Sequence, residues 1–386
     1  FSSFQIISKL FFILIESYYN FAFIYIKQMM LIKMIEKIML FFITKLSPEF
    51  AHKLTIFFLK YGLNSSIRPS NEKTLNIKLF GISLSNPIGL AAGFDKNAEA
   101  LKGLLKLNFS FIEVGTVTPK AQTGNKKPRI FRVKKNKSLI NSLGFPNKGA
   151  QTVFNNIRKI RKKHPLGNEP LIGVNIGYNK TSQNPISDYL YCIEKFYLIA
   201  DYLTINISSP NTPGLRDFHK KHKLKNLLEK IRAKVLVLEK KNSLKVPLVL
   251  KISPDLTYRE LNNLSKLIID FRFDAVIATN TSIRKNILED AKFTEKPGGV
   301  SGQALFEKSN KTLKDLKILS KNKFPIIAAG GISNWESIKE KISLGADAVQ
   351  IYTGLVYEGP DMITKSLNNL SMHLKNKNIP NISKIL

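Results

Sequence analysis

Short apolar runs recur along the chain from about residue 76 onward. Eight of them are rich in β-branched residues and apolar throughout, and most are separated by segments with helical spacing. Strands buried on both faces have this continuous apolar character, and their alternation with helices indicates a parallel sheet. The predicted strands are Pro87–Ala92, Phe111–Gly115, Leu171–Ile176, Tyr202–Ile207, Pro247–Ile252, Asp274–Ala278, Pro325–Ala329 and Asp347–Ile351.

Eight strand–helix units favour a closed α/β structure, the TIM (β/α)8 barrel, over residues 76–386. A doubly wound open sheet is the alternative, but this chain lacks the early Gly-x-Gly-x-x-Gly turn of such sheets. A polar residue or a glycine stands at the carboxyl end of each predicted strand. Barrel enzymes hold their chemistry at this end, so the pattern predicts an enzyme site there.

The first 75 residues have a different pattern. Residues 1–33 are mostly apolar and aromatic, and the stretch from Phe4 to Ile26 is broken by two charged residues, Lys9 and Glu16. We interpret them as an extension that is upstream translated sequence, a membrane anchor or a signal peptide. Residues 34–75 predict two short helices, near 35–46 and 49–61, followed by a linker.

The two predicted helices are more apolar than a single core-facing stripe requires, and lysines are interleaved along them. Ser47-Pro48 supplies an N-cap and a first-turn proline for the second helix. Amphipathic helices of this kind insert into one leaflet of a membrane. A helical cap packed on the barrel is the other interpretation, and the two are compatible.

Charge is the outlier in the composition, because 60 Lys and Arg against 28 Asp and Glu give a formal net charge of +32. Such a balance raises the hypothesis of a nucleic-acid binder. The lysines are spread along the whole chain rather than gathered in one arm, which favours a lysine-rich background and no nucleic-acid partner. A basic surface still favours docking on anionic lipid.

The single cysteine, Cys192, excludes an internal disulfide, an iron–sulfur cluster and a cysteine-based zinc site within this chain. It lies in the helix-like run 188–199 and is expected to be a buried structural thiol. The five histidines have no metal-site spacing, so we predict no metal.

Three connections are too long to be simple loops: residues 117–150, 208–222 and 281–303. Long loops at this end of a barrel are usually lids or specificity elements. Glycines after the last two strands would let backbone N–H groups approach a phosphate closely. Lys251 stands inside an apolar strand, where an unpaired charge is costly, so we expect a functional role rather than a structural ion pair.

Five longer runs carry a specific resemblance. They are Asn86-Pro-Ile-Gly-Leu-Ala-Ala-Gly-Phe-Asp-Lys96, Gly115-Thr-Val-Thr-Pro119, Asn206-Ile-Ser-Ser-Pro-Asn-Thr-Pro-Gly214, Gly298-Gly-Val-Ser-Gly302 and Ala329-Gly-Gly-Ile332. With these runs in this order, the chain resembles the dihydroorotate dehydrogenase family, specifically its membrane-associated, quinone-dependent class (class 2). The resemblance covers about residues 34–370.

The resemblance implies FMN as the cofactor and the oxidation of (S)-dihydroorotate to orotate in de novo pyrimidine (UMP) biosynthesis. Lys251 would offset negative charge on the reduced flavin, and Gly302, Gly331 and Thr353 suit its phosphate. Carried over residue by residue, the FMN site comprises Ala92, Gly93, Phe94, Asp95, Lys96, Thr116, Asn175, Asn206, Lys251, Thr279, Gly302, Gly331, Tyr352 and Thr353.

The implied substrate is a small planar imide with a carboxylate, and asparagine side chains offer both donors and acceptors for its ring edges. The sequence departs from the family in one place, because Ser142 and Pro146 stand where arginine and asparagine are usual. The substrate residues implied by the resemblance are Lys96, Asn141, Ser142, Leu143, Gly144, Phe145, Asn206, Asn211, Asn280 and Thr281.

The resemblance also implies a base that takes a proton from carbon five of the substrate, at Ser209 in the second long loop. Serine needs a hydrogen-bond relay for this task. The soluble classes of the family use a cysteine here, and the only cysteine of this chain lies elsewhere. The serine therefore favours the quinone-dependent class.

For the quinone, the resemblance implies a tunnel through the two N-terminal helices, lined by His52, Arg132 and Tyr352. The implied partners are dihydroorotate and orotate, ubiquinone or a related quinone, and the lipid surface, with no obligate protein partner. The implied location is peripheral, or monotopic, on the cytoplasmic face of the inner membrane.

Two other hypotheses remain at this point. One is another FMN barrel oxidoreductase, either a soluble-class dihydroorotate dehydrogenase or an enzyme like dihydrouridine synthase, which acts on RNA. The second is a non-enzymatic basic protein that binds membranes or nucleic acid, and this hypothesis predicts no bound flavin.

Overall fold

The computed structural model describes residues 34, 38, 40–64, 72–209 and 221–385. The chain divides into two compact units, residues 1–51 and residues 52–386, and each is described by itself. The predicted extension 1–33 and most of the second long loop lie outside the described residues.

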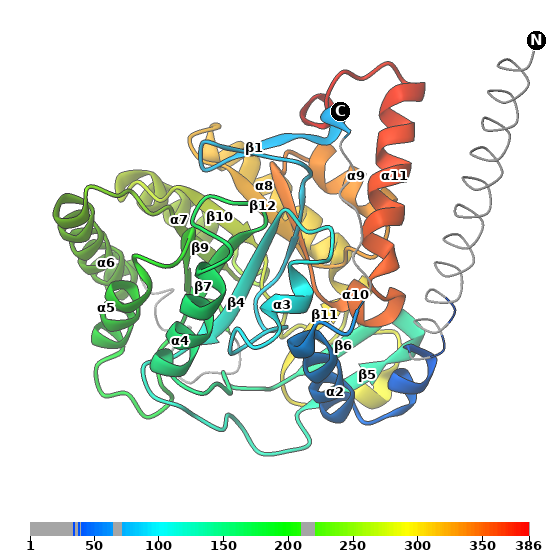
Figure 1. The fold of residues 1–386 in the computed structure, drawn as a ribbon, viewed down its shortest axis with the longest axis horizontal. Coiled ribbons are helices and arrows are strands. Elements are labelled where there is room, and N and C mark those ends of the chain that lie inside the picture. Colours follow the sequence, from blue (N-terminus) through cyan, green and yellow to red (C-terminus); the bar gives the residue numbers. More distant parts are fainter. Residues whose placement is uncertain (1–33, 35–37, 39, 65–71, 210–220, 386) are drawn as a thin grey trace, which may run out of the picture. The chain divides into compact units, whose positions relative to one another are not determined.

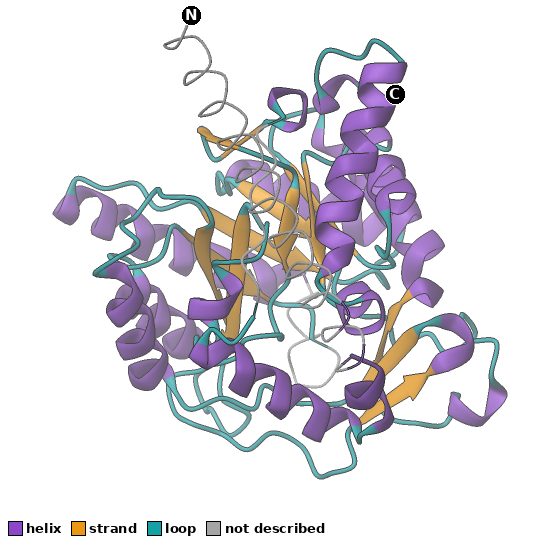
Figure 2. Ribbon diagram, turned by 45° about the vertical axis from the view of Figure 1, so that its right-hand side comes forward, coloured by secondary structure: helices purple, strands orange, loops and turns teal. Residues whose placement is uncertain are grey.

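Eight parallel strands form a closed barrel at the centre of the second unit, surrounded by helices (Figures 1 and 2). The order around the barrel is β3, β4, β7, β8, β9, β10, β12 and β13, and β13 pairs with β3 to close it. Each predicted strand is confirmed to within two residues at either end. The barrel strands are β3 (Ile88–Leu90), β4 (Phe111–Val117), β7 (Leu171–Ile176), β8 (Tyr202–Asn206), β9 (Leu248–Ile252), β10 (Ala275–Ala278), β12 (Ile326–Ala329) and β13 (Ala348–Ile351).

The helices follow the strands as a (β/α)8 barrel requires, and several begin with side-chain caps. Thr257 and Glu260 form a reciprocal capping box at the start of α7, which satisfies two otherwise unpaired backbone N–H groups. Cys192 is fully buried on α5, as predicted, and burial raises the pKa of its thiol. The helices are α3 (Leu101–Leu104), α4 (Ala150–Arg161), α5 (Pro185–Phe196), α6 (Lys221–Asn242), α7 (Tyr258–Asp270), α8 (Phe306–Ser320), α9 (Trp335–Ser343), α10 (Thr353–Glu358) and α11 (Asp361–Asn376).

Two of the predicted long loops contain an additional sheet. Strands β5 (Ile130–Val133), β6 (Ser138–Asn141) and β11 (Gly299–Gly302) pair antiparallel in the order β11-β6-β5. Val133, Ile140 and Val300 give this sheet its own small hydrophobic cluster. The loop interpretation was therefore incomplete, because the strands are short and pair across a long sequence separation.

A two-stranded hairpin precedes the barrel, with β1 (Ile77–Leu79) antiparallel to β2 (Ile82–Leu84). At its turn, the Phe80 ring lies 5.2 Å from the ring of Tyr202, which lies at the start of β8 inside the barrel. The hairpin therefore packs on the end of the barrel where the strands begin, opposite to the end that carries the predicted chemistry.

Large aromatic rings in the barrel require glycine on the neighbouring strand. A Cβ atom added at Gly173 on β7 would overlap the Tyr202 ring. We expect Gly173→Ala to lower the free energy of unfolding by about 1–3 kcal/mol, because overpacking in a dense core forces side chains off their rotamers. Urea denaturation measures this, and an unchanged midpoint would contradict the packing described here.

The N-terminal helices are present as predicted. Residues 40–45 are helical, and α2 spans Pro48–Tyr61. On the barrel side, α2 approaches α3 closely, since a Cβ at Gly103 would lie 2.6 Å from the carbonyl oxygen of Leu59. Lys106 donates to the carbonyl of Gly62 at 2.7 Å and fixes the end of the helix. Among the described residues, no helix combines the length and apolar character needed to cross a bilayer.

Candidate active site

A connected set of amide and hydroxyl groups lies at the carboxyl ends of the central strands. Thr116 donates to Asn175 at 2.6 Å, and Asn206 donates to both of them at 3.2 Å. Asn280 in turn donates to the Asn206 side chain at 3.3 Å. Thr116, Asn175 and Asn206 are buried and Asn280 is half-buried, so this network presents amide groups at the mouth of the barrel.

Below this network, Glu113 and Lys251 form a buried ion pair with 3.7 Å between Nζ and a carboxylate oxygen. The Glu113 carboxylate also accepts hydrogen bonds from Asn175, Thr204 and Gln350 at 2.8, 3.0 and 3.1 Å. Burial lowers the pKa of Lys251, and the Glu113 carboxylate opposes that shift. The structural ion pair, which we considered the weaker interpretation of Lys251, is thus present. Through Glu113 it connects Lys251 to the amide network.

The loop after β3 brings Lys96 back towards the barrel. Its ammonium donates to the carbonyl of Gly93 at 2.6 Å and lies 3.2 Å from His52 Nε2. The hydroxyl of Tyr352 donates to the same carbonyl at 3.3 Å. Burial raises the pKa of Tyr352 to about 12, so the phenol stays protonated and remains a donor at neutral pH.

Two other predicted residues of this loop have roles that the structure makes specific. The Asp95 carboxylate accepts backbone hydrogen bonds from Asn97, Glu99 and Ala100 and therefore shapes the loop itself. Burial raises the pKa of Asp95 to about 6. Phe94 lies between two other rings, as described below. Ala92 lies between β3 and Gly93 and is half-buried.

Close-packed glycines form a second part of the site, after β11 and β12. Gly302, Gly330 and Gly331 all have positive φ angles, which other residues rarely adopt. A Cβ at Gly331 would lie 2.5 Å from Phe306 Cα, and one at Gly302 would lie 2.9 Å from the Thr353 side chain. Close packing therefore requires glycine at these positions, and glycine-rich backbone is the kind whose N–H groups can approach a phosphate group closely. Thr353 begins α10 beside this cradle.

The loop that follows β6 folds over the amide network. Phe145 contacts Gly177 at the end of β7, where an added Cβ would lie 2.8 Å from both the Phe145 ring and the Thr116 methyl group. Gln122 donates to the carbonyls of Gly144 and Phe145 and fixes the turn. Asn141, Ser142 and Leu143 lead into it and are half-buried, and the Ser142 carbonyl accepts from Asn125.

Two serines end β8, and they differ in role. Ser208 donates to the Asn206 side chain at 3.2 Å and accepts from Asn280 at 3.0 Å, so it completes the amide network. Ser209, the predicted base, is 5% exposed and directly follows it. Thr279 and Thr281 flank Asn280, and Asn211 lies outside the described residues.

Three aromatic rings connect α2 with the barrel mouth. Phe94 lies edge-on to His52 at 5.7 Å and to Tyr352 at 5.8 Å between ring centroids. Burial and the Lys96 charge hold the pKa of His52 well below its usual range, so the imidazole is neutral at pH 7. Arg132 lies on β5, where burial lowers the pKa of its guanidinium and the nearby phenol of Tyr357 opposes that shift. Two of the three predicted quinone residues are thus linked through Phe94.

Comparison with known proteins identifies the family. A model of the family described as "Dihydroorotate dehydrogenase" matches residues 74–374. A Buchnera aphidicola protein named "Dihydroorotate dehydrogenase (quinone)" is 43% identical over 84% of this chain and 96% of its own length. A Bartonella tribocorum protein of the same name is 41% identical over 87% of this chain and 92% of its own length. The chain belongs to the dihydroorotate dehydrogenase family.

Solved structures agree with this assignment. The ligand-free dihydroorotate dehydrogenase of Eimeria tenella superposes with a TM-score of 0.82 at 33% identity, covering 88% of this chain and 98% of its own. The relatives carry the quinone-dependent name, which favours that class over the soluble class and over dihydrouridine synthase. The family is generally flavin-dependent.

Some members of this dehydrogenase site escaped the sequence interpretation. Glu113 and Gln350 were not assigned a role, although each makes hydrogen bonds within the network. A signal for Glu113 existed, since it is a single carboxylate in the apolar strand Phe111–Val117. Such a residue is rarely buried without a partner.

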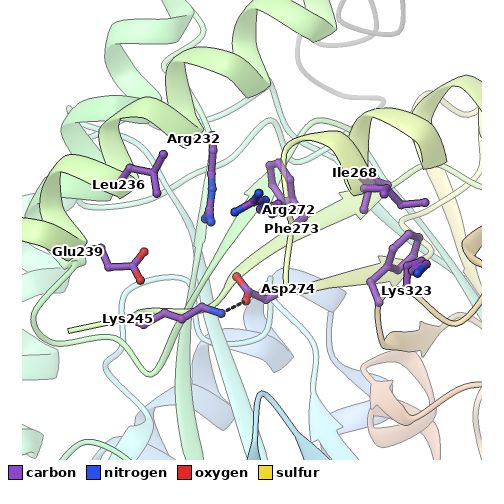
Figure 3. Close-up of a pocket in the computed structure, with 11 residues that line it drawn as sticks. Arg232, Leu236, Glu239, Lys245, Ile268, Arg272, Phe273, Asp274 and Lys323 are labelled. Carbon is purple, nitrogen blue, oxygen red and sulfur yellow. Dashed lines mark ion pairs between the residues drawn. The ribbon is translucent and has the colours of Figure 1, made fainter. Parts of the chain in front are cut away.

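A cavity of about 560 Å³ lies away from this site, between α6 and α7 (Figure 3). Arg232, Arg272 and Lys245 line it, and Lys245 pairs with Asp274 at 2.9 Å. Asp274 and Lys245 precede strands β10 and β9, so the cavity opens at the amino ends of the strands. It is therefore separate from the dehydrogenase site, which lies at the carboxyl ends.

Proposed function

We propose that this chain oxidises (S)-dihydroorotate to orotate in de novo pyrimidine (UMP) biosynthesis and passes the electrons through FMN to a membrane quinone. The observation that carries the proposal is the amide network centred on Asn206, with Lys251 beneath it and Ser209 beside it. It occurs in a chain whose relatives are named quinone-dependent dihydroorotate dehydrogenases.

The residues at the barrel mouth fit FMN. The close-packed glycine backbone at Gly302 and Gly331, with Thr353 beside it, would hold the phosphate. Lys251 would offset negative charge on the reduced flavin, and Thr116, Asn175 and Asn206 would offer hydrogen bonds to its polar groups. When bound, FMN supplies the redox chemistry by accepting a hydride from carbon six of the substrate and releasing two electrons to the quinone.

The substrate would lie against the amide network. Asn206 and Asn280 offer donors and acceptors to the imide, and the turn 141–145 covers it from the side of Phe145. Lys96 would pair with the substrate carboxylate. Ser209 would take the proton from carbon five while passing its own hydroxyl proton on through a hydrogen-bond relay. Loss of this proton and of the hydride from carbon six leaves the double bond of orotate.

For the quinone, the support is the ring series His52–Phe94–Tyr352, which leads from α2 to the barrel mouth. We assign residues 34–75 to a helical subdomain that gives quinone access, with Arg132 at the same tunnel. Exposed apolar side chains on the N-terminal helices and directly after α2 support docking on a lipid surface. They are Met34, Ile38, Phe41, Phe42, Phe50, Phe57, Tyr61 and Leu63.

We place the protein on the cytoplasmic face of the inner membrane, as a peripheral protein. Exposed apolar residues in this number, with a net charge of +32, suit an interface that is both apolar and anionic.

The decisive experiment separates the two half-reactions. The purified full chain in detergent is mixed with dihydroorotate without oxygen, and the flavin absorbance is followed before and after ubiquinone is added. We expect bleaching by dihydroorotate and recovery with ubiquinone. Recovery only with fumarate would contradict the quinone-dependent class, and no bleaching despite bound FMN would contradict the substrate.

Membrane docking has its own test in Phe57, which is 52% exposed on α2. We expect Phe57→Ser to weaken sedimentation with anionic vesicles by about tenfold, since a buried phenylalanine contributes roughly 1.5–3 kcal/mol. Tyr258→Ser, at an exposed aromatic of α7, is the matched control and should leave binding unchanged. Equal losses in the two variants would contradict docking through α2.

A further inference from the structure

A fully buried lysine lies behind the glycine cradle and plays no part in the site described so far. Lys341, on α9, is 0% exposed. Its ammonium donates to the Ser309 hydroxyl on α8 at 2.6 Å. It also lies 5.0 Å from the centroid of the Phe306 ring. Among the described residues, Ser309 is its only hydrogen-bond partner, although an ammonium has three donors.

Ser309 connects this ammonium to the cradle itself. Its hydroxyl lies 3.0 Å from the Gly330 carbonyl oxygen and 2.8 Å from that of Phe306. Gly330 and Gly331 directly follow β12, and a Cβ at Gly331 would strike the backbone of Phe306. Lys341 is therefore connected, through the Ser309 side chain, to the Gly330 and Phe306 backbone segments at the rear of the cradle.

The surroundings of Lys341 do not neutralise it in full. Burial lowers the pKa of Lys341 to about 7, and the charges of Glu340 and Glu307 only partly oppose this. Glu340 is itself engaged by Asn310 at 2.6 Å. The elements packed on α9 also carry Lys317 on α8, Asp347 before β13 and His373 on α11.

We propose that Lys341 is a positioning residue for the phosphate of the flavin cofactor, acting through Ser309 and Gly330, and that it makes the affinity for the phosphorylated flavin depend on pH. This rests on the proposed binding of FMN at the cradle. The cation would complement a phosphate dianion from behind the loop, through Ser309 and the Gly330 backbone.

The direction of the pH dependence follows from linkage. Without a phosphate in the cradle, Lys341 loses its proton as the pH rises through about 7. A bound dianion favours the charged lysine, so binding takes up a proton above pH 7. The affinity for FMN should then fall between pH 7 and pH 9, by as much as tenfold per pH unit. The second ionisation of a phosphate ester, near pH 6, is complete in this window.

Riboflavin separates this lysine from groups near the ring, because it has the same ring and no phosphate. The experiment measures the dissociation constants of FMN and riboflavin for the flavin-depleted full chain, by flavin fluorescence, from pH 6 to pH 9. We expect the affinity for FMN to fall above pH 7 while that for riboflavin changes much less. Titration of Lys251, which would lie near the ring, would change the affinity for both ligands alike.

The variant Lys341→Met keeps the length of the side chain and removes the charge, and a buried charge replaced by an apolar side chain is often tolerated. We expect it to weaken FMN binding about tenfold at pH 6.5, to remove the pH dependence above pH 7 and to leave riboflavin binding unchanged. Lys339→Met, on the same helix, removes one charge as the matched control and should bind both ligands like the unmodified chain.

The outcomes distinguish this inference from the proposed function. If Lys341→Met weakens the binding of FMN and of riboflavin equally, the lysine has only a structural role and the inference is overturned. A flat pH profile for FMN in the unmodified chain would overturn it without any variant. Binding of neither flavin by the unmodified chain would overturn the proposed cofactor, and the inference with it.

Discussion

Replacing Ser209 by alanine is expected to slow the bleaching of the bound flavin by dihydroorotate by about 100- to 10,000-fold, the range that a positioned acid or base supplies. The residue is buried beside the amide network, and the proton on carbon five would have no other assigned acceptor. Anaerobic stopped-flow absorbance measures the rate directly. Recovery of the flavin with ubiquinone should be unchanged, because no proton leaves carbon five in that half-reaction.

A second variant distinguishes lost chemistry from lost structure. Ser209→Cys supplies a different base at the same position, and the thiolate is the group that the soluble classes use. We expect it to bleach faster than Ser209→Ala at pH 8 and to gain rate as the pH rises towards the thiol pKa, near 8.5. If Ser209→Ala bleaches within threefold of the unmodified rate, the base is another residue.

The second large effect concerns stability. Glu113→Ala is expected to lower the free energy of unfolding by about 3–5 kcal/mol, because it leaves the buried ammonium of Lys251 without its carboxylate. Asn175, Thr204 and Gln350 would also lose their acceptor. Urea denaturation of the flavin-depleted protein measures the change without stabilisation by bound cofactor.

Two controls test this explanation. The double variant Glu113→Leu with Lys251→Met removes both charges and should recover most of the lost stability, while the flavin site loses its cation. Glu194→Ala breaks an exposed ion pair with Lys234 of 2.7 Å and should leave the unfolding midpoint nearly unchanged. If the double variant is less stable than Glu113→Ala, the loss comes from packing rather than from an unpaired charge.

The local pattern was sufficient for the barrel strands and for much of the site. Leu171–Ile176 was predicted with its observed bounds, because a strand buried on both faces is visible as a continuous apolar run. Thr116, Asn175, Asn206 and Asn280 were predicted together and do meet, because the carboxyl ends of parallel strands share one rim.

The sheet formed by β5, β6 and β11 shows where local reasoning ends. Asn141 pairs with Gly299 across more than 150 residues, and each strand has only four residues. Strands this short have too few alternating positions to be separated from loop sequence, and their partners are chosen by the barrel that brings the two loops together.

Reading the chain residue by residue is enough to find the eightfold alternation, the rim of polar residues and the serine in place of a cysteine. The partners of the buried and half-buried side chains are visible only in the folded barrel. They are Glu113 for Lys251, Ser309 for Lys341, and Tyr352, through Phe94, for His52. This difference arises because the apolar periodicity that predicts a strand is a local pattern, set within a few residues of the chain. The partner of a buried charge is set by strand order and helix packing across the whole barrel.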